Sequence, residues 1–396
     1  MDIDRRDFLR RSLGAAIGGS LLRPVLAGEE AGATPAIPLA YSGQNVVVVR
    51  FGGGVRRRET IDPRHTYAPW FRHSLVPRGT LFTKMEISQF EGAETSHGQG
   101  TLYILTGRYE KYRDIQNEFL RERFEANSPT IFESLRKHFD VPRHQALIIN
   151  GEDRTDEEFY SFSNHHLFGL RYRSEVLSLY RFKVYLLERQ LEDPDLEEKE
   201  RKEKRKALAQ LKSIDPRSSS IELESPEIKA FWHRWRAMYG DSGLKNARGD
   251  ALLAELAVRA FRELRPRLTM INFQDPDYVH WGTPSHYTRG ITAIDRALER
   301  IVALLDHDEF YRDRTTLVVV PDCGRDSNRL LRVPYQHHFG SRSSHEIFAF
   351  VMGPGIAAGR VVDREVDQSS IASTIGRVMG FPTPHAEGPV LEEAFA

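Results

Sequence analysis

The stretch TTLVVVPDCGRDSN, residues 315–328, holds the pattern that decides the fold, because an apolar run ends there in a group of polar residues. The run at 316–320 does not alternate between polar and apolar positions, which predicts a strand covered on both faces. Runs of the same kind occur at residues 46–49, 146–149, 268–273 and 347–352. Together these runs predict one largely buried sheet.

Amphipathic helical patterns lie between these strands. One helical stripe consists of Tyr287, Ile291, Ile294, Leu298, Ile301 and Leu305. Ser128-Pro129 is typical of a helix start, here for residues 131–139, and Asp250 is expected to cap another helix. Alternating strands and helices predict an α/β fold with a mostly parallel central sheet and helices on both faces.

The predicted α/β domain spans residues 40–396 and contains a mainly helical insertion at about 153–248. Within the insertion, residues 195–206 read DLEEKERKEKRK, with opposite charges three and four positions apart. This pattern predicts a solvated helix that projects from the domain. An arm that binds a partner protein is the alternative interpretation.

The N-terminal segment has the pattern of an export signal. Residues 4–10 read DRRDFLR and contain the pair Arg5-Arg6, and a weakly apolar stretch at 12–22 is followed by small or medium residues at 25–27. This pattern predicts a twin-arginine (Tat) signal peptide at residues 1–27, recognised by the Tat export machinery. The apolar stretch is about half of the roughly 20 residues that a spanning helix needs, so no stable membrane anchor is expected. The predicted location is periplasmic or secreted.

The charge balance excludes some function classes. The chain carries 56 basic and 56 acidic residues, and residues 1–27 hold five of the arginines and three of the aspartates, which leaves 51 and 53. A nearly neutral chain does not have the net basic surface of a general nucleic-acid binder. Cys323 is the only cysteine, so no intrachain disulfide can form. No nucleotide-binding motif follows the glycine run at 52–54.

Polar residues gather where the predicted strands end. In open parallel sheets, ligand sites form beyond the carboxyl ends of the strands. Glycines 52–54 follow the first predicted strand, Asp277 and His280 follow the strand at 268–273, and Asp322 and Cys323 follow the strand at 316–320. His337, His338 and His345 precede the last predicted strand. Carboxylate, imidazole and thiolate groups are the ligands that zinc and similar ions prefer. The pattern therefore predicts a metal site.

Each of these residues also has a structural interpretation. Asp322 could cap a turn or a helix, and His280 could be a core histidine with one hydrogen bond. His337 and His338 are neighbours, and neighbours on an extended chain point to opposite sides, so only one of them is expected to be a ligand. The joint placement at strand ends favours the functional interpretation.

Five segments carry a family resemblance. They are HGQGTLYILTGRY (97–109), SPTIFESLRKHF (128–139), DPDYVHWGTPSHYTRGITAIDRAL (275–298), TTLVVVPDCGRDSN (315–328) and YQHHFGSRSSHEIFAFVMGPGI (335–356). In this order and approximate spacing, the chain resembles the alkaline phosphatase and sulfatase superfamily. It resembles equally well a Tat-exported group of proteins related to that superfamily.

The resemblance implies a hydrolase of phosphate or sulfate esters with two divalent metal ions, which activate a hydroxyl nucleophile. Asp277, His280 and either His337 or His338 are implied as ligands of one ion, and Asp322 as a ligand of the other. Zinc is the expected metal, with calcium or manganese as alternatives, and a small-molecule ester is the expected substrate.

The chain also departs from the superfamily pattern. The first strand of the superfamily ends at a metal-binding aspartate, and the glycines 52–54 stand here instead. Cys323 replaces the histidine that follows the second aspartate, and a thiolate can still bind zinc. Alignment on the Leu-Thr-Gly at 105–107 brings His97 to the nucleophile position, with the hydroxyl residues Thr95 and Ser96 just before it.

Two functions remain open from the sequence. The first is a divergent metal-dependent ester hydrolase that works outside the cytoplasm. The second is a catalytically inactive binding or scaffold protein on the same fold, because glycines at a strand end let a ligand approach closely without supplying chemistry. A transferase related to phosphomutases is a third, less favoured option.

Overall fold

The computed structural model describes residues 40–89, 93–109, 126, 128–151, 168–212, 224–241, 249–281, 283–326, 335–337 and 341–396. The chain divides into residues 1–37 and a compact unit at 38–396. The predicted signal peptide, with Arg5 and Arg6, and the candidate ligand His338 lie outside the described residues.

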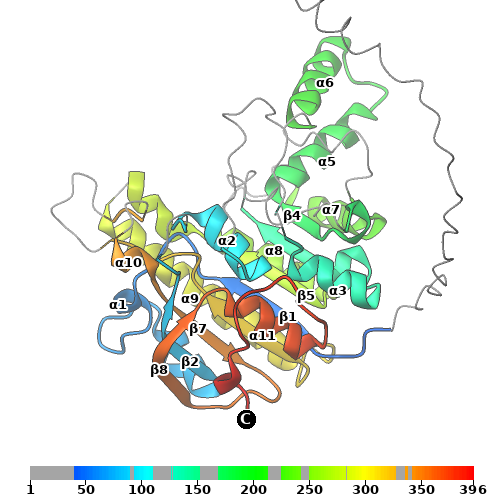
Figure 1. Ribbon diagram of the computed structural model, residues 1–396. Helices are drawn as coiled ribbons and strands as arrows, with labels where there is room; N and C mark the ends of the chain where they lie inside the picture. Colours follow the sequence, from blue (N-terminus) through cyan, green and yellow to red (C-terminus); the bar gives the residue numbers. More distant parts are fainter. Residues whose placement is uncertain are drawn as a thin grey trace, which may run out of the picture. The chain divides into compact units, whose positions relative to one another are not determined.

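A single eight-stranded sheet forms the centre of the unit (Figure 1). Its strands are, in spatial order, β4 (Glu175–Ser178), β3 (Ala146–Asn150), β5 (Leu268–Asn272), β1 (Asn45–Arg50), β6 (Thr315–Val320), β7 (Glu346–Met352), β2 (Thr80–Glu86) and β8 (Arg360–Asp367). Every described pairing is parallel except those of β7, which runs antiparallel to β6 and β2. The prediction of an α/β fold with a mostly parallel sheet is confirmed.

Helices cover both faces of the sheet, as the burial of β1 shows. Val47 and Val49 pack in one core cluster with α8 (Gly249–Leu264) and α9 (Pro284–His307). Val46 and Val48 point the opposite way, into a second cluster with the helices α2 (His97–Thr106), α3 (Ile131–Phe139) and α11 (Ser370–Met379). Two-sided burial explains why the strand sequences do not alternate.

Two predicted helix starts are wrong in detail. Helix α3 is capped by Thr130, whose hydroxyl and backbone N–H form a capping box with Glu133, and not by Ser128-Pro129. Asp250 lies in the first turn of α8, and its carboxylate accepts hydrogen bonds of 2.8–3.0 Å from the backbone N–H groups of Gln274 and Asp275. This carboxylate therefore joins α8 to the loop after β5.

The region of the predicted insertion contributes α5 (Leu179–Leu191), α6 (Glu198–Lys212), α7 (Pro226–Tyr239) and the edge strand β4. Helix α6 buries none of its residues, as predicted for the charged segment 195–206. No helix among the described residues combines the length and the apolar character that a membrane span needs.

The direction of the strands determines where the site forms. The carboxyl ends of β5, β1 and β6 lie side by side, because these strands are parallel neighbours. Since β7 runs in the opposite direction, the residues that precede it reach the same edge of the sheet. Strand β2 is parallel to β1, so the chain that leaves it toward α2 also starts from this edge. Segments distant in sequence therefore meet at one place.

Candidate metal centre

Four chain segments bring polar side chains to this edge of the sheet. His97 is the first residue of α2, and Asp277 lies in the 3₁₀ helix η7 (Asp275–Trp281) that follows β5. Asp322 follows β6, and His337 precedes the short helix α10 (Arg342–His345) that leads into β7. His97, Asp277, Asp322 and His337 are all at most 7% exposed, so they form a buried polar cluster.

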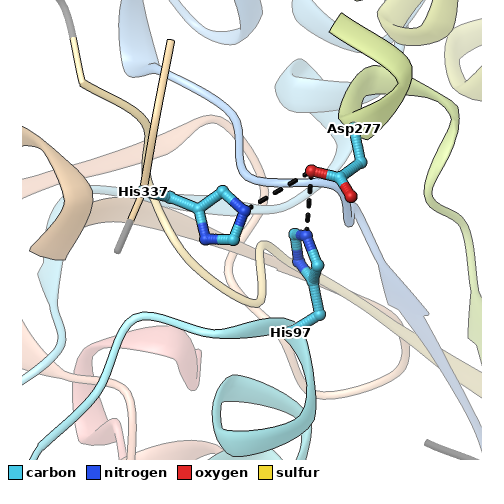
Figure 2. Close-up of side chains that lie close together, drawn as sticks. All are labelled: His97, Asp277 and His337. Carbon is cyan, nitrogen blue, oxygen red and sulfur yellow. Dashed lines mark ion pairs between the residues drawn. The ribbon is translucent and has the colours of Figure 1, made fainter. Parts of the chain in front are cut away.

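The cluster is centred on one carboxylate oxygen, Oδ1 of Asp277. Nε2 of His97 lies 3.0 Å from this oxygen, and Nε2 of His337 lies 3.4 Å from it (Figure 2). Nε2 of His280 lies 3.0 Å from the same atom, and the Arg325 guanidinium donates to it over 2.9 Å. Although burial alone would raise the pKa of Asp277, the positive charge of His97 and the hydrogen bonds of His280 and His337 hold it well below its ordinary range.

His97 stands between the two carboxylates of the site. Its Nδ1 lies 2.7 Å from Oδ2 of Asp322, while its Nε2 faces Asp277. Burial lowers the pKa of His97, but the charges of Asp322 and Asp277 outweigh this effect and raise it well above 6.5. Without a bound metal ion, this shift favours the protonated ring, which attracts both carboxylates.

The Nδ1 atoms of two histidines are held by acceptors, as in known metal sites. Nδ1 of His337 lies 2.7 Å from the backbone oxygen of Thr95, and Nδ1 of His97 faces the Asp322 carboxylate. An Nδ1–H donated to such an acceptor leaves Nε2 available as a metal ligand. Although Nε2 of His97 is close to Asp277, it makes no aligned hydrogen bond.

The spacing of these ligand atoms fits one metal ion. Ligand atoms of His97, Asp277 and His337 all lie within 4.8 Å of one another. Tetrahedral zinc with bonds of about 2.0 Å separates its ligand atoms by about 3.3 Å. The distances of 3.0 and 3.4 Å from Asp277 to the two histidines match this value. His97, Asp277 and His337 therefore suit one ion.

His280 approaches the same carboxylate from a different environment. Besides Asp277, its Nε2 lies 3.3 Å from the Arg325 guanidinium, and its Nδ1 lies 3.3 Å from the side-chain nitrogen of Gln336. It is not part of the converging group formed by His97, Asp277 and His337. The resemblance implied Asp277, His280 and either His337 or His338 as ligands of this ion. The converging group contains Asp277 and His337, and its third member is His97 instead of His280.

The other half of the site differs from the first in its charges. Asp322, His97 and Cys323 also lie within ligand distance of one another, but burial, followed by the charge of Asp322, raises the pKa of the Cys323 thiol to about 11. The Arg50 guanidinium lies 3.6 Å from Oδ2 of Asp322, and both side chains are fully buried. Asp322 therefore has a buried cationic partner in Arg50 besides His97.

The close packing of the glycine loop explains why no acidic side chain stands at residues 52–54. A Cβ atom on Gly52 would lie 2.1 Å from the backbone oxygen of Phe273 and 2.9 Å from the Arg50 side chain. Gly53 has a φ of +78°, and its Cβ would lie 2.6 Å from the backbone oxygen of Gln274. The loop is packed too closely for side chains at these positions.

Arg325 fills the space beside this loop. Its guanidinium donates to the backbone oxygens of Gly53, Gly54 and Tyr335 as well as to Asp277, and its side chain is fully buried. Each carboxylate of the site thus has a buried arginine partner, Arg325 for Asp277 and Arg50 for Asp322. Both arginines were missed at the level of the sequence, although Arg50 interrupts an apolar run and Arg325 lies three residues after Asp322.

The two candidate hydroxyl nucleophiles have structural partners. The Ser96 hydroxyl accepts a hydrogen bond from the backbone N–H of Gln99 and caps α2. The Thr95 hydroxyl donates to the backbone oxygen of His337. His97, the third candidate, is the one whose side chain enters the site.

Comparisons with known proteins support the fold. No protein-family model matches the sequence, and no curated protein matches it. Among solved structures, a protein of the alkaline phosphatase superfamily from Vibrio parahaemolyticus superposes with a TM-score of 0.54 at 13% identity, over 91% of this chain and 72% of that one. The 2-O GAG sulfatase BT1596 gives 0.53 at 12% identity, over 89% and 74% of the two chains.

A third structure extends the comparison. The sulfatase PsFucS1 from Pseudoalteromonas sp. gives a TM-score of 0.50 at 13% identity, with 89% of this chain and 71% of that chain covered. The resemblance that the sequence motifs indicated is thereby confirmed at the level of structure. This chain has the fold shared by proteins of the alkaline phosphatase superfamily and sulfatases.

Proposed function

We propose that this chain is a hydrolase of phosphate or sulfate esters that uses one divalent metal ion, held by His97, Asp277 and His337. The observation that carries the proposal is the convergence of two imidazole Nε2 atoms on one carboxylate oxygen, at 3.0 and 3.4 Å. Two nitrogen ligands and one oxygen ligand favour zinc over calcium, which prefers oxygen ligands only. Manganese remains the alternative.

The fold supports the choice of substrate class. The solved structures that share it include a protein of the alkaline phosphatase superfamily and two sulfatases. We therefore propose a small-molecule phosphate or sulfate ester as the substrate. The arginine pair at positions 5 and 6 supports export by the Tat route and action in the periplasm or outside the cell.

The residues of the chain have separate roles in this proposal. A bound ion supplies Lewis-acid chemistry, which polarises the ester oxygens. Asp322 fixes the ring of His97, and the Thr95 backbone oxygen fixes that of His337, so both Nε2 atoms are pre-oriented. Because the Thr95 hydroxyl donates to the backbone oxygen of His337 and the Ser96 hydroxyl caps α2, we propose that water and not a side chain attacks the ester.

The test is activity before and after metal removal. The mature protein, treated with a chelator and then supplied with zinc or manganese, is assayed on aryl phosphate and aryl sulfate esters. We expect hydrolysis of one ester class to return with the metal in the natural protein but not in His337→Gln. His345→Gln is the matched control, because His345 is also buried but contacts the backbone oxygen of Ile87 outside the cluster.

One observation favours the alternative, a binding protein without catalytic chemistry. Arg50 and Arg325 already provide positive charge to Asp322 and Asp277, so the cluster can persist without a metal. A folded protein that responds to neither zinc nor manganese and hydrolyses neither ester class would decide for this alternative.

A further inference from the structure

Strand β1 ends in a charged residue that the protein buries completely. The strand register places Arg50 beside Asn272 of β5 and Val320 of β6. Because side chains alternate along a strand, the side chain of Arg50 lies on the face that Val46 and Val48 share, and helix α2 covers this face. A buried guanidinium is costly unless its N–H groups bind acceptors. The acceptors of Arg50 therefore indicate what this residue does.

One contact of Arg50 leads to the ring of His97. Nη1 of Arg50 forms an ion pair with Oδ2 of Asp322 at 3.6 Å, and both side chains are 0% exposed. The same oxygen lies 2.7 Å from Nδ1 of His97. The other oxygen of Asp322 accepts hydrogen bonds from the backbone N–H groups of Gly54 and Cys323. Asp322 is thus held on both sides, and it connects Arg50 to the ring of His97.

A second contact of Arg50 leads to the backbone of His97. The same Nη1 atom donates a hydrogen bond of 2.8 Å to the hydroxyl oxygen of Thr101, which is also buried. This hydroxyl in turn donates to the backbone oxygen of His97 over 2.7 Å. A hydroxyl can accept one hydrogen bond and donate another, so both contacts of Thr101 are compatible. Arg50 is therefore linked to the ring of His97 through a carboxylate and to its backbone through a hydroxyl.

The surroundings of Arg50 fix the position of its guanidinium. Nη2 donates to the backbone oxygen of Phe273 over 3.4 Å. A Cβ atom on Gly52 would lie 2.9 Å from Nε and 3.3 Å from the guanidinium carbon, so the glycine loop packs directly against this side chain. A guanidinium is planar and presents its donors at fixed angles, whereas a lysine ammonium is a single point charge. A lysine at position 50 would keep the charge but lose the fixed arrangement of donors.

We propose that Arg50 is a positioning residue, which holds His97 in the metal centre by its ring and by its backbone at once. The proposal rests on the proposed function, because His97 is one of the three residues assigned to the ion. Nε2 of His97 meets the ligand atoms of Asp277 and His337 only while the ring keeps one orientation. Partners that orient metal-binding histidines commonly change metal affinity by 10–100-fold when they are removed. Arg50 acts on His97 through two such partners, Asp322 and Thr101.

The first test measures zinc affinity, by titration of the metal-free mature protein in competition with a chromophoric chelator. Arg50→Met should raise the Kd for zinc by about tenfold or more. Arg50→Lys should also raise it, because the charge remains but the two contacts of Nη1 cannot both be kept. In a protein that already carries His97→Gln, Arg50→Met should cause no further loss of zinc affinity, since two changes that act through one residue are not additive.

Milder variants keep the proposal testable if the Arg50 variants do not fold. Thr101→Val removes the contact with the backbone of His97 and keeps the ion pair with Asp322, so it should raise the Kd for zinc by a smaller factor than Arg50→Met. Thr101→Ser keeps the hydroxyl and should restore the natural affinity. Thr106→Val is the matched control, because the buried Thr106 hydroxyl also donates to the carbonyl four residues earlier, that of Leu102, but at the opposite end of α2. It should leave the Kd unchanged.

The second test needs no metal. In the metal-free protein labelled with ¹⁵N-histidine, the proton on Nδ1 of His97 is identified in NMR spectra by the loss of its signal in His97→Gln. Its exchange with solvent, measured at one pH, should be faster in Arg50→Met and Thr101→Val and unchanged in Thr106→Val, because the first two loosen the ring or the helix turn that carries it.

The outcome is separable from that of the proposed function. If the natural protein binds no zinc, the hydrolase proposal fails, and proton exchange at His97 still decides on the role of Arg50. If zinc binds equally well with Met or Lys at position 50, only the role of Arg50 is refuted. Proton exchange that ignores both Arg50→Met and Thr101→Val, or an equal loss of zinc affinity with and without His97→Gln, would overturn it as well.

Discussion

Metal binding to the chelator-treated protein should raise its melting temperature, and the size of the rise can be worked out. An ion that binds only the folded state at one hundred times its Kd stabilises that state by about 2.7 kcal/mol. The unit Pro38–Ala396 has roughly 360 residues, which at about 2.1 cal/mol/K per residue gives an unfolding entropy of roughly 0.75 kcal/mol/K. The expected rise in Tm is therefore about 3.5 °C.

The variants make this prediction specific. His337→Gln removes one of the two imidazole ligands and should abolish the rise. The starting Tm should also fall, because the buried hydrogen bond to Thr95 and the contact with Asp277 are lost. His345→Gln should keep the full rise, whatever its starting Tm. Differential scanning calorimetry with zinc, manganese and calcium in turn measures all three proteins.

Two results would refute the reasoning. If none of the three ions shifts the Tm of a folded mature protein, the converging residues are an ion-pair cluster and not a metal site. If the rise persists in full in His337→Gln, a metal binds elsewhere and the assignment of ligands is wrong.

Four further predictions concern the charges, the hydroxyls and the export signal. Because the folded pKa of His97 is raised, the stability it contributes is complete below the unfolded pKa of about 6.5 and is lost as the pH rises through the folded pKa. The urea midpoint of the chelator-treated protein should therefore fall on the alkaline side. An equally steep fall of the midpoint with pH in His97→Gln would contradict this. Ser96→Ala should lower the unfolding free energy by about 1 kcal/mol through the lost helix cap and leave hydrolysis intact; loss of activity in a folded variant would identify Ser96 as the nucleophile. Arg325→Met should cost about 3–5 kcal/mol in urea unfolding because Asp277 loses a buried partner, whereas Arg312→Met should change little. Arg5→Lys combined with Arg6→Lys should retain the protein in the cytoplasm, and cell fractionation that finds it exported would reject the Tat route.

Five of the eight strands could be predicted from the sequence, and β2, β4 and β8 could not. The runs that became β1, β3, β5, β6 and β7 are buried on both faces and read as uninterrupted apolar segments. Strand β8, RVVDREVD, lies at the sheet edge and exposes most of its charged residues, and β4 has only four residues. Neither has enough apolar character to stand out from a loop.

The direction of β7 could not be predicted either, because a buried apolar run has the same sequence pattern in a parallel and in an antiparallel strand. Four candidate residues, Asp277, His280, Asp322 and Cys323, were identified by the rule that sites form after the carboxyl ends of strands. It did not explain His337, whose position before a strand makes sense only once β7 is seen to be antiparallel.

The two buried arginines show a different limit of sequence reasoning. A single arginine in a sequence is normally read as a solvated charge, since arginine is rarely buried without a partner. The partners of Arg50 and Arg325 are Asp322 and Asp277, which lie 272 and 48 positions away and meet them only through the sheet order. Buried ion pairs of this kind depend on the fold, and no local sequence pattern predicts them.

The packing of Arg325 against the glycine loop also limits how this site can evolve. A carboxylate on the loop 52–54 would meet backbone atoms and the arginine side chains, and loss of Arg325 alone would leave three backbone oxygens and Asp277 without their shared donor. Each single change is therefore harmful by itself. A route from this site to one with an acidic loop needs coordinated substitutions in two segments, so the arginine arrangement, once established, resists reversal.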